Sequence, residues 1–217
     1  MHLPKRDNIK PTEIADPLKF YYLPFTKVFF IKRLALVNAM IKENTYDTLL
    51  DIGCGSGIFL KELKNRCNNL YAIDVHRKMH LVQEMIKKEE INANLTEASV
   101  IDLPYDSETF DCVVSVSVLE HIRELDRALN EIHRVAKRDA IIVLAFPVEN
   151  RITDILLRFA YTLLPNVKLE DEHVSTHTDI IHAADEIFKN SEICSYPACI
   201  PLDYSSYCVY KTIKQGQ

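Results

Sequence analysis

Apolar and polar positions alternate between two spacings along the middle of the chain. Short, mostly apolar runs predict buried strands, and apolar residues three and four positions apart predict amphipathic helices between them. We expect strands at 49–52, 70–75, 93–98, 110–117 and 140–146, and helices at 56–66, 77–90 and 123–137. Strands that alternate with helices in this way predict an α/β fold with a parallel, doubly wound, Rossmann-like sheet and helices on both faces.

Both ends of the chain depart from this rhythm. Four prolines within the first 24 residues predict an irregular arm, and apolar spacing predicts a helix over 26–43 behind it. After the last parallel strand we expect helices at 152–164 and 178–190, and strands at 193–199 and 205–213. The two final strands can pair as an antiparallel hairpin, so the sheet should be mostly rather than wholly parallel.

Charge and composition exclude several classes of protein. The net charge of −5, without a long basic run, argues against nucleic acid as the partner. The six cysteines lack CxxC spacing and predict reduced thiols. The first residues lack the apolar segment of a signal peptide, and the longest apolar stretch, 28–40, is too short and too interrupted to span a bilayer. We therefore expect a cytoplasmic protein.

Three of the four glycines lie in one loop between an expected strand and an expected helix, at Gly53, Gly55 and Gly57. Glycine is needed where φ is positive or where a ligand approaches the backbone closely, and open α/β sheets bind ligands at such strand ends. The dinucleotide fingerprint G-x-G-x-x-G is not met, because the third glycine comes one residue early and Ile58 takes its place. This spacing disfavours a nicotinamide-dependent oxidoreductase.

Two acidic residues further define the expected ligand. Asp51, two residues before the first glycine, would repel a phosphate and attract an ammonium group. Asp74 ends the second strand, where a carboxylate can accept hydrogen bonds from ribose hydroxyls, although a helix N-cap would also explain it. The loop therefore predicts a ligand that carries an amine and lacks phosphate, as the methionyl part of S-adenosylmethionine does.

Five segments in order resemble the class I S-adenosylmethionine-dependent methyltransferases, in particular the type 11 group. They are LDIGCGSG from Leu50, AIDV from Ala72, LPYD from Leu103 with FDCVVS from Phe110, VLEHI from Val118, and EIHRV from Glu131. The resemblance runs from about residue 48 to residue 147, nearly half of the chain. It implies S-adenosyl-L-methionine as the cofactor and S-adenosyl-L-homocysteine as the product.

The resemblance also implies which residues bind the cofactor. The methionyl end would be held by Asp51 and by the backbone of Gly53, Cys54, Gly55 and Gly57, and the ribose hydroxyls by Asp74. The remaining contacts would come from Val75 and His76 beside the adenine, Ser99 and Val100 at its edge, and the Ser115 backbone at the methionyl amine. Ser99 stands where the family usually has aspartate.

The expected activity is in-line methyl transfer to a small-molecule or lipid-like acceptor. His121, after the fourth strand, is the first candidate for a general base or substrate contact, although it can instead orient the loop. His173 resembles, with Glu172, a Glu-His pair often found in this family's substrate cover. A non-catalytic domain that binds S-adenosylmethionine as a sensor or partner module is the alternative. We expect one domain over 1–217: an arm and helix as a lid (1–45), a cofactor-binding core (46–147), and substrate-cover helices with the final hairpin (148–217).

Two other patterns have more than one interpretation. His173 and His177 have the spacing of metal ligands on a helix, with acidic residues nearby, but Ser175 and Thr176 are typical of a helix cap, so we expect no metal. The six aromatic residues within 20–30 can form a lid or pack in the core. Basic residues beside them permit a weak contact with a membrane surface, which we do not expect to be the main partner; they are Lys27, Lys32 and Arg33. The sequence predicts neither the acceptor nor the oligomeric state.

Overall fold

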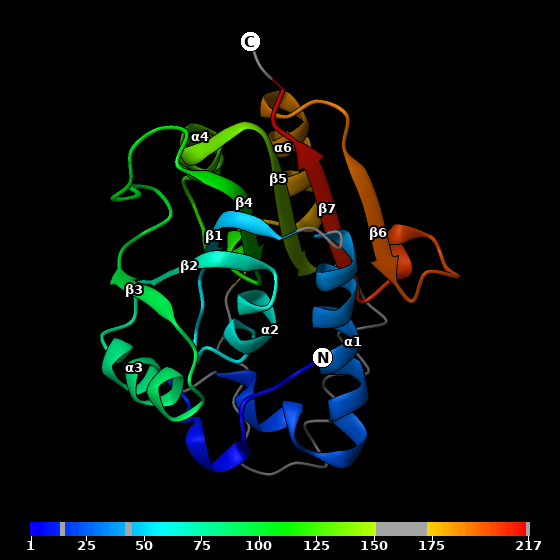
Figure 1. The fold of residues 1–217 in the computed structure, drawn as a ribbon. Coiled ribbons are helices and arrows are strands. Elements are labelled where there is room, and N and C mark those ends of the chain that lie inside the picture. Colours follow the sequence, from blue (N-terminus) through cyan, green and yellow to red (C-terminus); the bar gives the residue numbers. More distant parts are fainter. Residues whose placement is uncertain (14–15, 42–44, 151–172, 216–217) are drawn as a thin grey trace.

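The computed structural model describes residues 1–13, 16–41, 45–150 and 173–215, and a seven-stranded sheet forms its centre (Figure 1). The strand order is β3-β2-β1-β4-β5-β7-β6. The strands are β1 (Tyr46–Ile52), β2 (Cys67–Asp74), β3 (Ala93–Glu97), β4 (Phe110–Val116), β5 (Ala136–Pro147), β6 (Glu192–Tyr196) and β7 (Tyr207–Ile213). The first five pair in parallel, and β7 runs antiparallel to both β5 and β6. The predicted fold, including the C-terminal hairpin, is confirmed.

Helices cover both faces of this sheet. The α-helices are α1 (Pro24–Met40), α2 (Leu60–Lys64), α3 (Met79–Lys88), α4 (Leu125–Val135) and α6 (His177–Ile187), and the short 3-10 helices are η1 (Arg6–Asn8), η2 (Pro17–Tyr21), η3 (Leu119–His121) and η4 (Leu202–Tyr204). The expected helix over 152–164 lies outside the described residues. None of the helices in the described part of the chain combines the length and apolar character that crossing a bilayer requires.

Two hydrophobic clusters hold the layers together, one on each face of the sheet. Apolar residues of α1, α2 and α3 pack in the first cluster, and those of α4 and α6 pack in the second. Successive residues of β4 alternate between them: Cys112 and Val114 belong to the first cluster, and Val113 to the second. This alternation is the two-residue period of a strand that is buried on both faces, which explains why its sequence is almost continuously apolar.

The element boundaries differ most in the helix after the glycine loop. α2 begins at Leu60 and has five residues, whereas we expected a helix over 56–66. Gly57 has a φ of 82°, which is incompatible with a right-handed helix, so the chain can become helical only after the loop has turned. The apolar residues Phe59, Leu60 and Leu63 of this segment are all buried.

The N-terminal arm is tied to the helices of the first face. The His2 amide donates to Glu62 Oε2 at 2.6 Å, and the Lys5 amide and the Asn8 side chain donate to Glu89 Oε1 at 2.9 and 2.6 Å. The aromatic stretch that follows contributes Phe20 to the buried residues, and its ring stacks on Phe30 with 5.3 Å between ring centres. These rings therefore pack as part of the molecule's interior, which is one of the two interpretations of the aromatic pattern.

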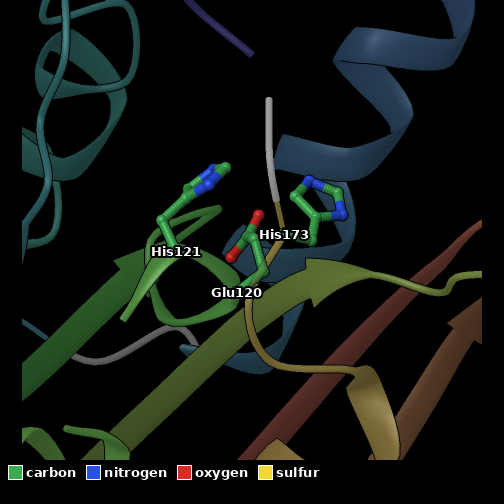
Figure 2. A group of neighbouring side chains, drawn as sticks. All are labelled: Glu120, His121 and His173. Atoms are coloured by element: carbon green, nitrogen blue, oxygen red, sulfur yellow. The ribbon is translucent and has the colours of Figure 1, made fainter. Parts of the chain in front are cut away.

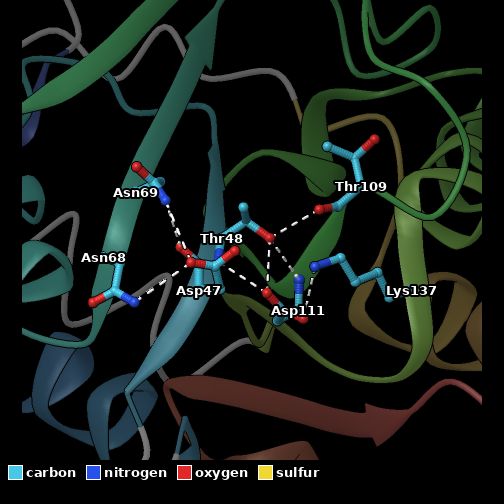
Figure 3. A network of polar contacts seen from close by, with 7 residues as sticks. All are labelled: Asp47, Thr48, Asn68, Asn69, Thr109, Asp111 and Lys137. Atoms are coloured by element: carbon cyan, nitrogen blue, oxygen red, sulfur yellow. Dashed lines mark hydrogen bonds and ion pairs between the residues drawn. The ribbon is translucent and has the colours of Figure 1, made fainter.

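A polar network joins residues near the amino ends of β1, β4 and β5 (Figure 3). The glycine loop follows the carboxyl end of β1, at the other end of these strands. The Thr48 amide and hydroxyl donate to Asp111 Oδ2, both at 2.9 Å, and Lys137 Nζ lies 3.0 Å from Asp111 Oδ1. Partial burial alone would raise the pKa of Asp111, but the hydrogen bonds from Lys137 and Thr48 outweigh it and hold that pKa below its ordinary value. Asp111 thus links β1, β4 and β5.

Replacing Asp111 with alanine should lower the free energy of unfolding by about 1–3 kcal/mol, because Thr48 and Lys137 lose a charged partner. Since the folded-state pKa of Asp111 is lowered, its contribution is present above the unfolded value of about 3.9 and is lost as pH falls through the folded value. Urea unfolding at pH 7 and pH 3 checks both statements.

Asp47→Ala is the matched control, because Asp47 is exposed and its carboxylate meets Asn68 and Asn69 only at 3.4 and 3.5 Å. We expect a change within about 0.5 kcal/mol. Equal urea midpoints for Asp111→Ala and Asp47→Ala would contradict the assignment of the network's stability to Asp111.

Candidate cofactor and acceptor site

The glycine loop leaves the carboxyl end of β1 and is bonded to the neighbouring strand. The amides of Gly53 and Cys54 both donate to the Ile73 carbonyl of β2, at 2.9 and 3.0 Å. Gly53, Gly55 and Gly57 have φ angles of 76°, 53° and 82°. L-residues with side chains rarely adopt this region, so the backbone path itself accounts for the glycine cluster seen in the sequence.

Close packing adds a second requirement at Gly53. A Cβ atom there would lie 2.1 Å from Val118 Cγ2, so the segment after β4 rests directly against the loop. At Gly55, by contrast, a Cβ would meet no heavy atom within 4 Å. The loop is therefore packed against protein at Gly53 and leaves open space at Gly55.

Asp74, at the end of β2, braces this loop. Its Oδ2 accepts the Gly55 amide at 2.7 Å, and its Oδ1 accepts the His76 amide at 3.2 Å. A carboxylate has about four acceptor positions, so both oxygens can still accept hydroxyl hydrogen bonds. Asp74 is the last residue of β2, as predicted, and its contact with the loop is one that the sequence did not reveal.

His76 also supports the glycine loop, through a contact with Gly55. Its ring is buried, its Nδ1 accepts the Lys78 amide at 3.2 Å, and its Nε2 lies 2.9 Å from the Gly55 carbonyl oxygen. Because Nδ1 acts as acceptor, the proton is on Nε2, which donates to that carbonyl. Val75, beside it, is 64% exposed and available to a ligand. The two residues expected at the adenine therefore differ: Val75 faces outward and His76 positions the loop.

The predicted adenine-edge residues lie next to the end of β2. The Ala98 amide donates to the Asp74 carbonyl at 3.0 Å, which brings Ser99 beside that strand end. The Ser99 hydroxyl accepts the Ile101 amide at 3.4 Å, at the long end of hydrogen-bond geometry. The Val100 side chain is buried in the second cluster, so only its backbone can reach a ligand.

Asp51 is the most unusual group at this edge of the sheet. It is buried, and no hydrogen bond is among the causes of its shifted pKa. Burial and the neighbouring Asp74 raise the pKa of Asp51 to about 7. A buried carboxylate without donors is costly unless a cation approaches it. Asp51 is thus suited to bind an ammonium group.

Ser115 lies near Asp51 along the sheet but faces the other way. It is in register with Ile52, and strand alternation places both side chains with the second cluster, whereas Asp51 is in register with Val114 of the first cluster. The buried Ser115 hydroxyl has no hydrogen-bond partner among the described residues. Only the Ser115 backbone can therefore reach a ligand at the loop.

The two candidate histidines come together beside this loop, although 52 positions separate them (Figure 2). His121 ends η3, and its ring centre lies 5.1 Å from that of His173. The amides of Val174 and Ser175 donate to the Glu120 carbonyl at 2.8 and 3.1 Å, which holds the two segments together. Figure 2 shows the two rings on either side of the Glu120 side chain.

Glu149 lies beside His173, and a third histidine, His177, follows it at the start of α6. His173 Nδ1 lies 2.7 Å from Glu149 Oε1. Thr176 caps α6, so His173 and His177 do not share a helix, and the buried His177 ring instead lies 3.5 Å from Asp203. The helical His173–His177 pair that the spacing allowed is therefore absent, and the expected acidic neighbours Glu170 and Glu172 lie outside the described residues.

Arg33 of α1 reaches the segment that follows β4. Its Nη2 donates to the Ser117 hydroxyl at 2.6 Å, and its guanidinium lies over the Tyr207 ring, 4.1 Å from the ring centre. Burial would lower the pKa of Arg33, but the nearby Tyr207, Tyr21 and Glu120 outweigh it and raise that pKa. Arg33 therefore makes its contacts toward the interior, whereas Lys27 and Lys32 are exposed. The long-range contact with Ser117 has no signal in the sequence.

Comparison with known proteins identifies relatives of this chain. A family model described as "Methyltransferase domain" matches residues 50–144. The arginine-hydroxylase NDUFAF5, a mitochondrial protein of Mus musculus, is 31% identical over 59% of this chain and 36% of its own length. The putative methyltransferase YrhH of Bacillus subtilis (strain 168) is 30% identical over 58% of this chain and 70% of its own length. The chain spans 36% to 55% of the length of the first four curated relatives that it matches.

A solved structure shares the architecture. The N-methyltransferase NodS from Bradyrhizobium japonicum WM9, in complex with S-adenosyl-l-homocysteine, has a TM-score of 0.63 at 17% identity. The likeness covers 93% of this chain and 94% of that chain. At this level of identity it shows a common fold.

Proposed function

The chain belongs to the class I S-adenosylmethionine-dependent methyltransferases of the type 11 group, and on that premise we propose that it transfers a methyl group from S-adenosylmethionine to a small-molecule or lipid-like acceptor. Asp51 carries the proposal, because a buried carboxylate whose pKa is raised by burial and by Asp74 suits the ammonium group of this cofactor. We further propose that residues 1–217 act as one methyltransferase domain, with residues 1–45 and 148–217 covering the acceptor.

The residues at the carboxyl edge of the sheet fit this cofactor. Asp51 would bind the ammonium group, the Gly53–Gly57 backbone the methionyl chain, and Asp74 the ribose hydroxyls. The exposed side chain of Val75 would contact the adenine, and the backbone at Ser99, Val100 and Ser115 would complete the set. When bound, S-adenosylmethionine supplies a methyl group already activated by its sulfonium. The protein then has to align the acceptor and exclude water.

His121 and His173 are the groups proposed to contact the acceptor. His121 lies on the segment whose Val118 packs against Gly53, and the His173 ring centre lies 5.1 Å from that of His121. If Nδ1 of His173 donates to Glu149, its Nε2 is left unprotonated and can accept a proton from a hydroxyl or amine. The carboxylate thereby fixes which nitrogen faces the acceptor.

Replacing either His121 or His173 with alanine should lower kcat by about 10²- to 10⁴-fold, the range for loss of a general base. Affinity for S-adenosylhomocysteine should not change, because neither ring braces the cofactor loop. His182→Ala is the control, since His182 is exposed on α6, where it lies 3.6 Å from Glu186. A full kcat in both His121→Ala and His173→Ala would remove these residues from the mechanism.

The experiment for the proposed function uses a methyl-labelled cofactor. The protein is incubated with it and with separate aqueous and lipid extracts, and labelled products are identified by mass spectrometry. We expect a product with the wild-type chain and none with Asp51→Asn. Cofactor binding without product in either extract would favour the non-catalytic sensor over the enzyme.

A further inference from the structure

We propose that Glu120, His121 and His173 form a binding site for one divalent transition-metal ion of the zinc class. Each residue offers one ligand atom, and these atoms all lie within 4.8 Å of one another. Two imidazoles and one carboxylate are the ligand set of catalytic zinc sites, in which the remaining position stays open. This set differs from the His173–His177 pair suggested by the sequence, because His121 takes the place of His177.

The backbone holds the ligands together without the ion. The amides of Val174 and Ser175 both donate to the Glu120 carbonyl, and the Ser175 hydroxyl donates to the Ile122 carbonyl at 3.0 Å. These three bonds join the segment before α6 to the η3 turn on both sides of His121. Because the two segments are already fixed, ion binding would not have to order them.

The arrangement of the two rings agrees with a shared ion. Imidazole nitrogens about 2 Å from one metal ion place the two ring centres about 5 Å apart. The ring centres of His121 and His173 are 5.1 Å apart, with 63° between the ring planes. The Glu120 carboxylate lies between them (Figure 2), so one ion can reach all three side chains after small rotations.

Glu149 supplies the supporting contact that metal-binding histidines commonly have. Its Oε1 lies 2.7 Å from His173 Nδ1. A proton on Nδ1 donated to this carboxylate leaves Nε2 with a free electron pair for the ion, which is the carboxylate–histidine–metal arrangement. Glu149 is exposed, whereas Glu120 is buried, so the two carboxylates serve as outer support and direct ligand respectively.

Neighbouring groups determine how tightly the site should bind an ion, and Arg33 is one of them. Glu120 is close enough to Arg33 to contribute to its raised pKa, so the guanidinium reduces the affinity of a cation at Glu120. An ion held by these residues would lie beside the site proposed for the acceptor, where it could bind an oxygen of that molecule and make it more acidic. With the ion bound, the two histidines would act on the acceptor through the ion and not as free bases. Metal binding itself does not depend on the proposed methyl transfer.

The test uses the full chain, free of any affinity tag and treated with a chelator, titrated with Co²⁺ as the spectroscopic probe. We expect one equivalent to bind, with visible absorption bands that disappear when Zn²⁺ is added. Glu120→Gln, His121→Ala and His173→Ala should each abolish the bands, and Glu149→Gln should weaken binding by about 10- to 100-fold. His182→Ala should bind like the wild type, because it lies outside the site.

Circular dichroism and S-adenosylhomocysteine binding confirm that each variant folds, and because the His121 side chain is exposed, His121→Ala is the least disruptive of the ligand variants. No Co²⁺ bands in the wild type, or bands that persist in both His121→Ala and His173→Ala, would overturn the site. A chain that binds Co²⁺ and transfers no methyl group contradicts only the proposed function. A chain that methylates and binds no metal contradicts only this site.

Discussion

Asp51→Asn is expected to stabilise the cofactor-free protein above pH 7 while it weakens cofactor binding. The native pKa of Asp51 is raised to about 7 by burial and by Asp74, against about 3.9 in the unfolded chain. Between these values the native state binds more protons, so ionisation of Asp51 destabilises the protein increasingly as pH rises, and the full cost is present above pH 7. Asparagine removes the charge. We expect a gain on the order of a few kcal/mol at pH 8 and almost none at pH 4, by urea unfolding.

The same substitution removes the partner of the cofactor's ammonium group. Loss of one member of a buried charge pair costs about 2–5 kcal/mol, so the dissociation constant for S-adenosylhomocysteine should rise at least ~30-fold. In the wild type, affinity should fall about tenfold per pH unit below pH 7, because Asp51 becomes protonated. In Asp51→Asn this dependence should disappear, whereas Asp111→Asn, at the opposite edge of the sheet, should keep it. A destabilised Asp51→Asn at pH 8 would show that Asp51 is already paired in the free protein.

Gly53→Ala is expected to lower the free energy of unfolding by about 3–5 kcal/mol and to abolish cofactor binding. Two causes add: the residue has a φ of 76°, and the new Cβ would lie 2.1 Å from Val118 Cγ2. Either Val118 or the loop has to move, and the loop carries the amides expected to hold the cofactor. Urea unfolding and calorimetric titration with S-adenosylhomocysteine measure the two effects.

Two control variants separate the cost of the positive φ from the cost of the contact between the new Cβ and Val118. Gly55→Ala has a similar φ of 53° and no neighbour within 4 Å, so it should cost only about 1–2 kcal/mol. In the Val118→Ala background, Gly53→Ala should cost less than in the wild type, because Cγ2 is gone and Val118 Cβ would be 3.4 Å away. Equal costs at Gly53 and Gly55 would contradict the account of the loop's packing.

The sheet could be predicted from the sequence because its signal is local. The central strands contain compact apolar runs, and residues such as Cys112 and Val113 are buried on opposite faces, so few polar positions interrupt these runs. The strand β3 at the edge of the sheet is the exception, because it mixes polar and apolar residues. The glycine loop could also be predicted, because Gly53, Gly55 and Gly57 each occupy a position where the backbone has a positive φ. The length of α2 could not be predicted. The positive φ of Gly57 prevents a helical backbone there, so the helix begins only at Leu60, although the apolar spacing starts earlier.

Contacts between distant segments could not be predicted. The sequence suggested His121 and His173 separately, but their meeting depends on the amides of Val174 and Ser175, which bind the Glu120 carbonyl. Likewise, nothing near Arg33 indicates that it reaches Ser117. Such contacts follow from where the topology places each segment, and single-residue patterns carry no information about that.

The most direct test of the central claim is calorimetric titration with two ligands that differ at the amine. S-adenosylhomocysteine carries the amino-acid end, and 5′-methylthioadenosine lacks it. If Asp51 and the 51–57 loop hold the cofactor, the wild type binds one equivalent of the first far more tightly than the second, and Asp51→Asn binds both weakly and about equally. No binding of S-adenosylhomocysteine at saturating concentrations, or an unchanged preference in Asp51→Asn, would contradict the account.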